Sequence, residues 1–163
     1  MLADQDSKSS KKQKRHDEIK KWEKKNNFVY ATTEANEIEN LIAPEILKGI
    51  LKDELKIDKD KVDGLELKSD DYKEVGLGEF IMEKYYKGMP IKKIRQIKGE
   101  SGTLKYDYKT KFSIYVHKKV EEEKVEDGKI TWDDIAKNQY AKNLIENIFE
   151  FIKTHNGKFS ELE

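Results

Sequence analysis

Apolar residues recur at three- and four-residue steps over the C-terminal part of the chain. This spacing places them on one face of an α-helix. Thr131 is a good N-cap, two acidic residues follow in the first turn, and Asn156-Gly157 is a natural stop. We therefore expect one long C-terminal helix that packs through this apolar face. Its apolar members are Trp132, Ile135, Ala136, Tyr140, Leu144, Ile148, Phe149 and Ile152.

Similar spacing predicts further helices upstream. One is expected from Lys11 to Asn26, and another begins at Pro44, which suits a first helical turn. Residues Lys56–Lys68 are mostly charged and contain Asp63-Gly64, so we expect mostly loop there, and again over Gly99–Gly102. The expected apolar faces are Ile46, Leu47, Ile50, Leu51 and Leu55 after Pro44, then Leu77, Phe80, Ile81 and Tyr85, and finally Phe112, Val116 and Val120.

Two short segments near the N-terminus have the character of strands. Leu2-Ala3 resembles the end of a buried strand, and Phe28–Tyr30 has a β-branched and aromatic bias. Strand, helix and strand in succession are typical of a parallel α/β unit. We therefore expect an α/β fold that is mostly helical, with a partial parallel sheet over residues 1–42 and a helical region over residues 43–163.

Composition indicates where the protein acts more clearly than what it does. Charged residues make up 40% of the 163 positions and apolar residues 36%, yet the apolar ones are clustered enough for a modest core. The 33 basic and 33 acidic residues cancel, which leaves a local nucleic-acid patch possible. Without cysteine there is no disulfide framework or zinc ribbon. No apolar run is long enough to span a membrane, so we expect a cytoplasmic protein without a membrane partner.

The first candidate for chemistry is Asp4-Gln5-Asp6-Ser7, directly after Leu2-Ala3. Two carboxylates at the carboxyl end of a strand can converge on one divalent cation, and hard oxygen ligands suit Mg²⁺ or Mn²⁺. Asp4 and Asp6 are therefore the candidate metal ligands. The alternative is a polar turn that caps the following helix.

The second candidate is Glu37-Ile38-Glu39-Asn40, just after the second expected strand. Consecutive strands of a parallel sheet end at the same edge, so Glu37 and Glu39 could approach Asp4 and Asp6. The alternative is the start of an amphipathic helix with solvated carboxylates.

Two groups of basic residues are candidates for contact with phosphate. The first lies in a lysine-rich run and includes Lys11, Lys12, Lys14 and Arg15, which could hold a nucleic-acid backbone. The second is Gly102-Thr103-Leu104-Lys105-Tyr106, followed by Lys109 and Lys111. In this segment Lys105 or Lys111 is expected to stabilise charge on a metal-bound phosphate. The alternatives are a solvated helix face and ordinary surface lysines. The three histidines are scattered and suggest no site.

Taken in order, these segments resemble the second half of a TOPRIM domain. The closest likeness is to OLD-like ATP-dependent endonucleases, where an AAA/ABC-type ATPase carries a C-terminal TOPRIM nuclease. The segments that carry the resemblance are Leu2–Ser7, with its D-x-D pattern, and Asn36–Leu41, with E-I-E-N. The resemblance implies Mg²⁺- or Mn²⁺-dependent phosphodiester cleavage in phage defence, with Asp4 and Asp6 as metal ligands and Glu37 or Glu39 nearby. DNA is the expected substrate in preference to RNA.

The departures from that family matter as much as the likeness. The upstream glutamate strand and the ATPase motifs are not in this sequence. We therefore expect an upstream ATPase/TOPRIM portion to act in cis or in trans, and this chain to be nearly inert alone. The alternative function is a non-catalytic helical module that binds protein or nucleic acid.

Overall fold

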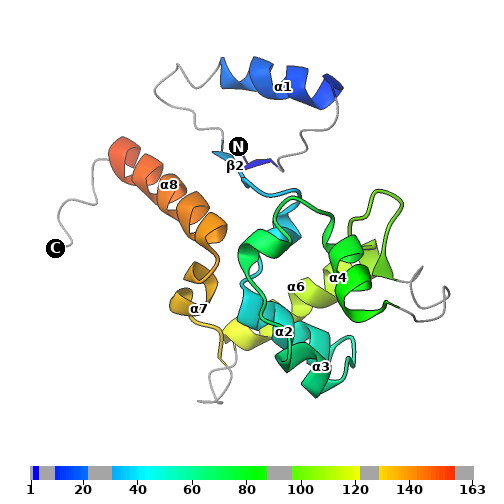
Figure 1. The fold of residues 1–163 in the computed structure, drawn as a ribbon. Helices are drawn as coiled ribbons and strands as arrows, with labels where there is room; N and C mark the ends of the chain where they lie inside the picture. The colour runs from blue at the N-terminus through cyan, green and yellow to red at the C-terminus, as the bar shows by residue number, and fades with distance from the viewer. Residues whose placement is uncertain (1, 4–9, 22–30, 88–96, 122–128, 157–163) are drawn as a thin grey trace.

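A computed structural model describes residues 2–3, 10–21, 31–87, 97–121 and 129–156. Figure 1 shows helices of different lengths joined by irregular segments. Within the described ranges the α-helices are α1 (Ser10–Lys20), α2 (Pro44–Asp53), α3 (Lys59–Asp63), α4 (Leu77–Tyr85), α6 (Tyr106–Glu121), α7 (Trp132–Ala136) and α8 (Gln139–Asn156). Two 3₁₀ turns, η1 (Ile38–Leu41) and η2 (Ser69–Asp71), complete the helical elements.

The predicted α/β class is wrong, because the described part of the chain is helical. Its β structure consists of one strand pair, β1 (Leu2–Ala3) parallel to β2 (Ala31–Thr32) with Ala3 opposite Thr32, and an isolated antiparallel bridge between Lys98 and Leu104. A pair of two-residue segments is too short to form a sheet, since an independent sheet needs about three or more strands of several residues. The expected second strand, Phe28–Tyr30, lies outside the described residues.

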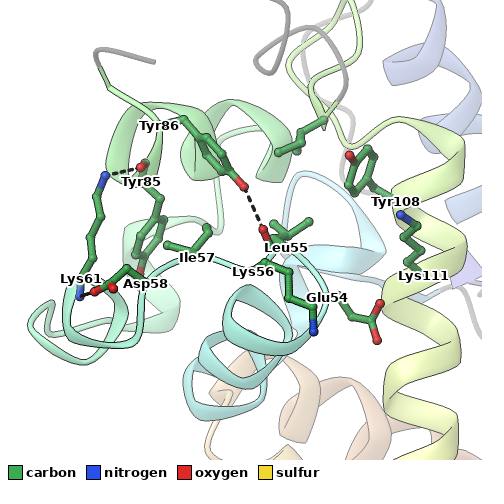
Figure 2. A pocket seen from close by; sticks show the side chains of 11 residues that line it. Glu54, Leu55, Lys56, Ile57, Asp58, Lys61, Tyr85, Tyr86, Tyr108 and Lys111 are labelled. Carbon is green, nitrogen blue, oxygen red and sulfur yellow. Dashed lines mark hydrogen bonds between the residues drawn. The ribbon is translucent and has the colours of Figure 1, made fainter. Parts of the chain in front are cut away.

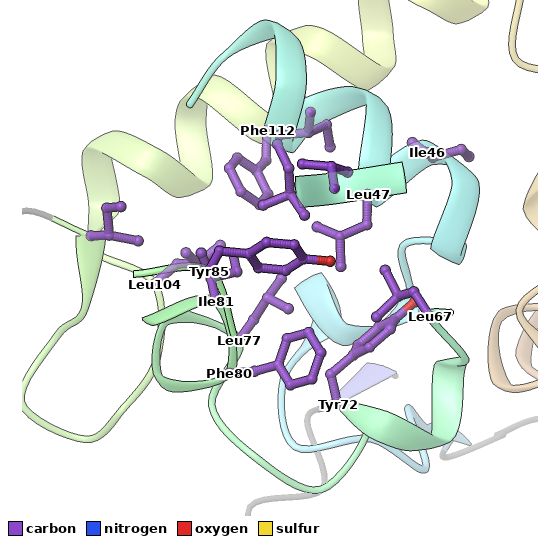
Figure 3. Close-up of a cluster of buried hydrophobic side chains, with 14 of the residues drawn as sticks. Ile46, Leu47, Leu67, Tyr72, Leu77, Phe80, Ile81, Tyr85, Leu104 and Phe112 are labelled. Atoms are coloured by element: carbon purple, nitrogen blue, oxygen red, sulfur yellow. The ribbon is translucent and has the colours of Figure 1, made fainter. Parts of the chain in front are cut away.

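The core forms where α2, α4 and α6 meet. Pro44 begins α2, as the sequence predicts, and four residues of its expected apolar face are buried, whereas Leu55 lies beyond the helix and is half-buried. The expected apolar face of α4 is buried, and Phe112 brings α6 onto both helices (Figure 3). Residues three and four apart lie on one side of each helix, which is why these stripes meet. The side chains at the centre are Leu47, Ile50, Leu51, Leu77, Ile81, Tyr85 and Phe112.

The expected single C-terminal helix is instead two helices, α7 and α8, that break at Asn138. The side-chain Oδ1 of Asn138 accepts from the N–H groups of Tyr140 (3.0 Å) and Ala141 (3.3 Å), which caps the start of α8. Its Nδ2 donates to the carbonyls of Asn40 (3.1 Å) and Ile42 (3.3 Å). Asn138 is fully buried. Its side chain caps the start of α8 and also fixes this helix to the residues of η1 and its C-cap.

Two aromatic residues expected to anchor this region lie largely in solvent. Trp132 is 45% exposed and Phe149 is 67% exposed. Helical spacing predicts which side chains share a face, but packing decides how much of that face is covered. In α8 the buried residues are Ala141 and Leu144, near its first turn, and the helix ends at Asn156 as predicted.

A short helix also occurs where mostly loop was expected. Asp58 accepts from the N–H groups of Asp60 (3.0 Å) and Lys61 (3.2 Å) and so caps α3. Val62 is the buried residue of this helix. Among the helices that the structure describes, none combines the length and apolar character required to cross a lipid bilayer.

A close backbone crossing fixes the start of α4. A Cβ atom added at Gly78 would lie 2.4 Å from the carbonyl oxygen of Thr103, and one at Gly76 would lie 2.3 Å from the carbonyl carbon of Gly102. The N–H of Glu79 donates to the carbonyl of Gly102 at 2.7 Å. Glycine is needed here because only a backbone without Cβ can approach so closely. This contact positions Leu77, whose N–H points at the candidate site.

Candidate functional site

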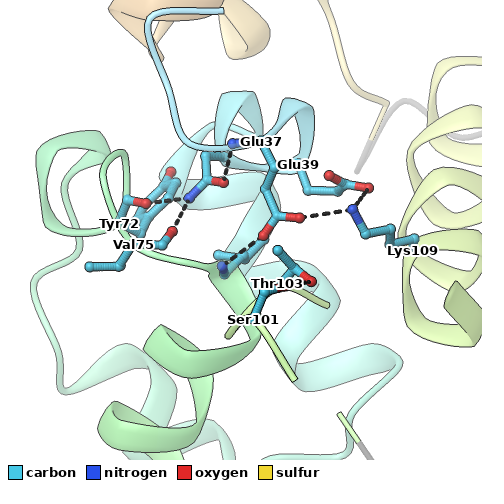
Figure 4. A network of polar contacts seen from close by, with 9 residues as sticks. Glu37, Glu39, Tyr72, Val75, Ser101, Thr103 and Lys109 are labelled. Atoms are coloured by element: carbon cyan, nitrogen blue, oxygen red, sulfur yellow. Dashed lines mark hydrogen bonds and ion pairs between the residues drawn. The ribbon is translucent and has the colours of Figure 1, made fainter. Parts of the chain in front are cut away.

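The candidate site is built around Glu37, a carboxylate that is only 3% exposed (Figure 4). Its Oε1 accepts from the backbone N–H of Leu77 at 3.0 Å. Its Oε2 accepts from Nζ of Lys109 at 2.8 Å. Both oxygens of this buried group therefore have a donor, one from α4 and one from α6.

Glu39 lies beside Glu37 and shares the same lysine. Nζ of Lys109 is 3.0 Å from Oε1 of Glu39, whose side chain is 14% exposed. The second oxygen, Oε2, is buried and has no hydrogen-bond partner among the described residues. Lys109, with a third of its side chain exposed, thus bridges two carboxylates and leaves one oxygen available.

The electrostatics of the cluster follow from its burial. Burial raises the pKa of Glu37 above its ordinary value, although Lys109 and the N–H of Leu77 act in the opposite direction. Burial by itself would lower the pKa of Lys109, but its hydrogen bonds to Glu37 and Glu39 raise it above the ordinary value. Lys109 therefore stays protonated at neutral pH and acts as a fixed positive charge.

The turn that carries both glutamates is held from the inside by Asn40. The backbone N–H of Glu37 donates to Oδ1 of Asn40 at 3.2 Å. Nδ2 of Asn40 donates to the carbonyls of Tyr72 and, at 2.9 Å, of Val75. The first contact closes the turn and the other two fix it against the segment before α4, so the two carboxylates have little freedom to move apart.

Of the lysines in this segment, the sequence singles out Lys105 and Lys111, and neither pairs with the two glutamates in the described part of the chain. Lys105 precedes α6 and is exposed, and Lys111 is exposed on another side of the helix, with Nζ 5.0 Å from the ring centre of Tyr108. The structure brings Lys109 to the glutamates instead. A usable signal exists, since Lys109, Phe112 and Val116 follow helical spacing and so share the face toward the core. A lysine on the core-facing side of a helix is expected to pair with a carboxylate, because buried charges are rarely left unpaired.

The predicted metal ligands Asp4 and Asp6 lie outside the described residues. In sequence Asp4 directly follows Ala3, the last residue of β1, and β1 runs parallel to β2, five residues before Glu37. Among the residues that can be placed, no three or more His, Cys, Asp or Glu side chains gather to hold a metal ion. The described part therefore offers at most a portion of a ligand set.

The four predicted nucleic-acid contacts all belong to α1. Lys14 and Arg15 are exposed on this helix, and Lys11 and Lys12 lie in its first turns. Figure 1 shows α1 beside the β1–β2 pair, at the end of the molecule away from α3. A basic helix thus follows directly after the segment that contains Asp4 and Asp6.

Comparison with known proteins gives no relative: no protein-family model, curated protein or solved structure matches this chain. The likeness to TOPRIM nucleases stays a resemblance in two short segments, Leu2–Ser7 and Asn36–Leu41. Since function resides in a site and not in a fold, the arrangement of Glu37, Glu39 and Lys109 has to be interpreted from its own chemistry.

Proposed function

We propose that this chain contributes to a divalent-metal site that cleaves nucleic-acid phosphodiester bonds. Glu39 and Lys109 act at its described side, with Asp4 and Asp6 as further metal ligands. The observation that supports the proposal is the buried Oε2 of Glu39, which has no partner in the described part of the chain. A buried acceptor without a donor costs about 1–3 kcal/mol, so the cluster gains stability when a cation reaches that atom.

The chemistry of the donor set fits Mg²⁺ or Mn²⁺, which prefer carboxylate oxygens. Both oxygens of Glu37 are already occupied, so Glu39 is the ligand that this cluster can supply. Glu37 is then a positioning residue that holds Lys109 in place. When bound, the metal supplies charge neutralisation at phosphate and an activated water.

Lys109 has the properties of an electrostatic donor and lacks those of a general base. Its ammonium is held by Glu37 at 2.8 Å and by Glu39 at 3.0 Å, and it remains a third exposed. A preorganised cation of this kind stabilises negative charge that develops on a phosphoryl oxygen. Its raised pKa keeps the proton on the lysine, which excludes it as a proton acceptor at neutral pH.

The exposed basic residues of α1 support a nucleic-acid substrate. Lys14, Arg15 and Lys20 are exposed there. Cations that contact backbone phosphates release counterions, so affinity should fall steeply with salt and depend little on base sequence. In this proposal α1 holds the strand and supplies none of the chemistry.

Mn²⁺ binding by titration calorimetry tests the site. Wild type should bind Mn²⁺, whereas Glu39→Gln should bind at least tenfold more weakly, because it replaces an anionic ligand by a neutral one. The matched control is Glu79→Gln, which alters another Glu–Lys pair, with Lys98 at 2.5 Å, and should leave Mn²⁺ affinity unchanged.

Cleavage of plasmid DNA with Mn²⁺ separates the two roles. Lys109→Met should abolish any nicking and retain Mn²⁺ binding, since the lysine touches phosphate and not metal. Wild-type protein that binds no Mn²⁺, or Glu39→Gln protein that binds it as well as wild type does, would contradict the metal site.

A second candidate is a non-catalytic helical module that binds a protein. An apolar groove of about 300 Å³ lies where η1, α2, α6, α7 and α8 meet, and this observation favours it. Its lining includes Ile38, Leu41, Ile46, Val116 and Leu144. Under this alternative the Glu37–Lys109 pair only holds α6 to η1, and Glu39→Gln would alter neither metal binding nor cleavage.

A further inference from the structure

A separate pocket of about 360 Å³ lies on another side of α6 (Figure 2). Small-ligand pockets begin at roughly 300 Å³, so the volume suits a compact ligand. Its apolar part comes from Leu55, Ile57 and Ile97 and from the rings of Tyr86 and Tyr108. The hydroxyl of Tyr86 donates to the carbonyl of Leu55 at 3.4 Å, which holds this ring against the wall.

The rim of the pocket carries three lysines and two acidic residues. Of the two acidic residues, Asp58 is engaged in capping α3 and Glu54 is exposed at the rim. Nζ of Lys61 donates to the carbonyl of Tyr85. Lys56 and Lys111 are exposed, and neither forms an ion pair within the part of the chain that the structure describes. Nζ of Lys111 lies 5.0 Å from the ring centre of Tyr108. Of the two lysines that remain available, Lys111 therefore lies beside an aromatic ring of the pocket, and Lys56 lies elsewhere on its rim.

Lys56 occupies a backbone conformation that favours glycine. Its φ is 53°, in the left-handed region, at the turn after α2. The N–H of Ile57 closes this turn on the carbonyl of Leu51 at 3.0 Å. A side chain with a Cβ atom costs free energy here, and such strain concentrates at ligand clamps. The structure thus holds a lysine at the pocket rim in a position where glycine would be more stable.

We propose that this pocket binds one nucleotide unit, with the base against Tyr86 and Tyr108 and the phosphate between Lys56 and Lys111. Aromatic walls accept any base because every base has a π-face, and lysines supply the charge for phosphate. The unit is either a free nucleoside monophosphate or one nucleotide of a single strand.

This pocket is distinct from the glutamate cluster, and the inference goes beyond the proposed cleavage. Glu37, Glu39 and Lys109 do not line this pocket. Lys109 and Lys111 are two positions apart, which turns them about 200° from one another around α6. Binding can therefore be measured in EDTA, where failure of the metal site has no influence on the result.

Titration calorimetry in EDTA tests the pocket with defined probes. The probes are the four common nucleoside 5′-monophosphates, the unphosphorylated nucleosides, inorganic phosphate and a short single-stranded oligonucleotide. The monophosphates should bind, and nucleoside or phosphate alone should bind at least about tenfold more weakly, since each makes half of the contacts. Because α1 is also expected to bind a strand, only the oligonucleotide binding that Lys56→Gly removes is assigned to the pocket. If that binding is tighter than nucleotide binding, a strand is the source, and if it is equal or weaker, the free nucleotide is the source.

Two variants locate the binding. Lys56→Gly should weaken nucleotide binding about tenfold while its thermal midpoint stays at least as high as that of wild type, because the strain is relieved. Lys111→Ala should weaken binding similarly. The control, Lys142→Ala on α8, removes an exposed lysine that lies 3.8 Å from Glu146 and should change nothing. Absence of nucleotide binding at millimolar concentration, or equal affinity in Lys56→Gly and wild type, would overturn the proposal.

Discussion

The side-chain Nδ2 of Asn138 donates to the backbone carbonyl of Asn40 at 3.1 Å, and so joins residues 98 positions apart. Asn40 in turn accepts from the backbone N–H of Glu37. Two buried amides therefore connect the start of α8 to the turn that carries both glutamates. The C-terminal helix thus takes part in holding the candidate site although it contributes no side chain to it.

Asn138→Ala should lower the free energy of unfolding by about 2–4 kcal/mol, because it removes the side-chain donor to the carbonyl of Asn40 and the cap of α8. Urea denaturation measures this loss. The control is Asn143→Ala, whose side chain pairs with Gln139 near the surface at 2.6 Å, and it should cost less than about 0.5 kcal/mol. Equal losses in the two variants would show that Asn138 has no special role.

Gly78→Ala should destabilise the fold by about 1–3 kcal/mol although alanine is the better helix former. The new Cβ would meet the backbone oxygen of Thr103 at 2.4 Å, and neither segment can retreat without breaking the crossing. Gly49→Ala in α2 is the comparison, since its added Cβ would meet the far end of a side chain, the hydroxyl of Tyr115 at 2.6 Å, and no backbone atom. Thermal unfolding should show a much smaller change at Gly49.

Tyr85→Phe should raise stability by about 1 kcal/mol. The Tyr85 ring lies in the core, and its hydroxyl is buried without a hydrogen-bond partner among the described residues. Removing an unsatisfied buried polar atom recovers its desolvation cost. A lower midpoint in urea would indicate that the hydroxyl has a partner, and Tyr72→Phe, which loses a 2.6 Å bond to the carbonyl of Ile42, should be destabilising.

Asp134 should contribute stability that disappears in acid. Hydrogen bonds from Lys137 and from the N–H and hydroxyl of Thr131 lower its pKa to about 2, below the ordinary 3.8. The folded state therefore favours the carboxylate, so the contribution is complete above pH 3.8 and is lost as the pH falls toward 2. Carboxyl NMR titration measures the pKa. Asp134→Asn should remove this part of the acid transition, and Asp133→Asn should retain it.

The helices were predictable where a continuous apolar face exists. Pro44 marks the start of α2, and four residues of the predicted face, Ile46, Leu47, Ile50 and Leu51, are buried. In contrast, the break at Asn138 depends on carbonyls of Asn40 and Ile42, almost a hundred residues away. Local spacing contains no information about such partners, which is why two helices were predicted as one.

For the sheet and the site, too, local sequence features were predictable and long-range contacts were not. Strand character at Leu2-Ala3 and Phe28–Tyr30 suggested an α/β fold, but two-residue pairing leaves the helices to form the core. For the site, sequence order singled out Glu37 and Glu39. The burial of Glu37 could not be predicted, because it depends on a hydrogen bond from the N–H of Leu77, forty residues away. The position of that N–H depends in turn on the close backbone approach at Gly76 and Gly78.

The separation of Glu37 from Lys109 by 72 positions also has a consequence for synthesis. At about 5–20 residues per second, the ribosome adds the lysine about 4–14 seconds after the glutamate. During that interval Glu37 has to stay hydrated, and α2 and α4 cannot close over it without burying an uncompensated charge. Emergence of α6 therefore sets the earliest moment at which the nascent chain can complete its core.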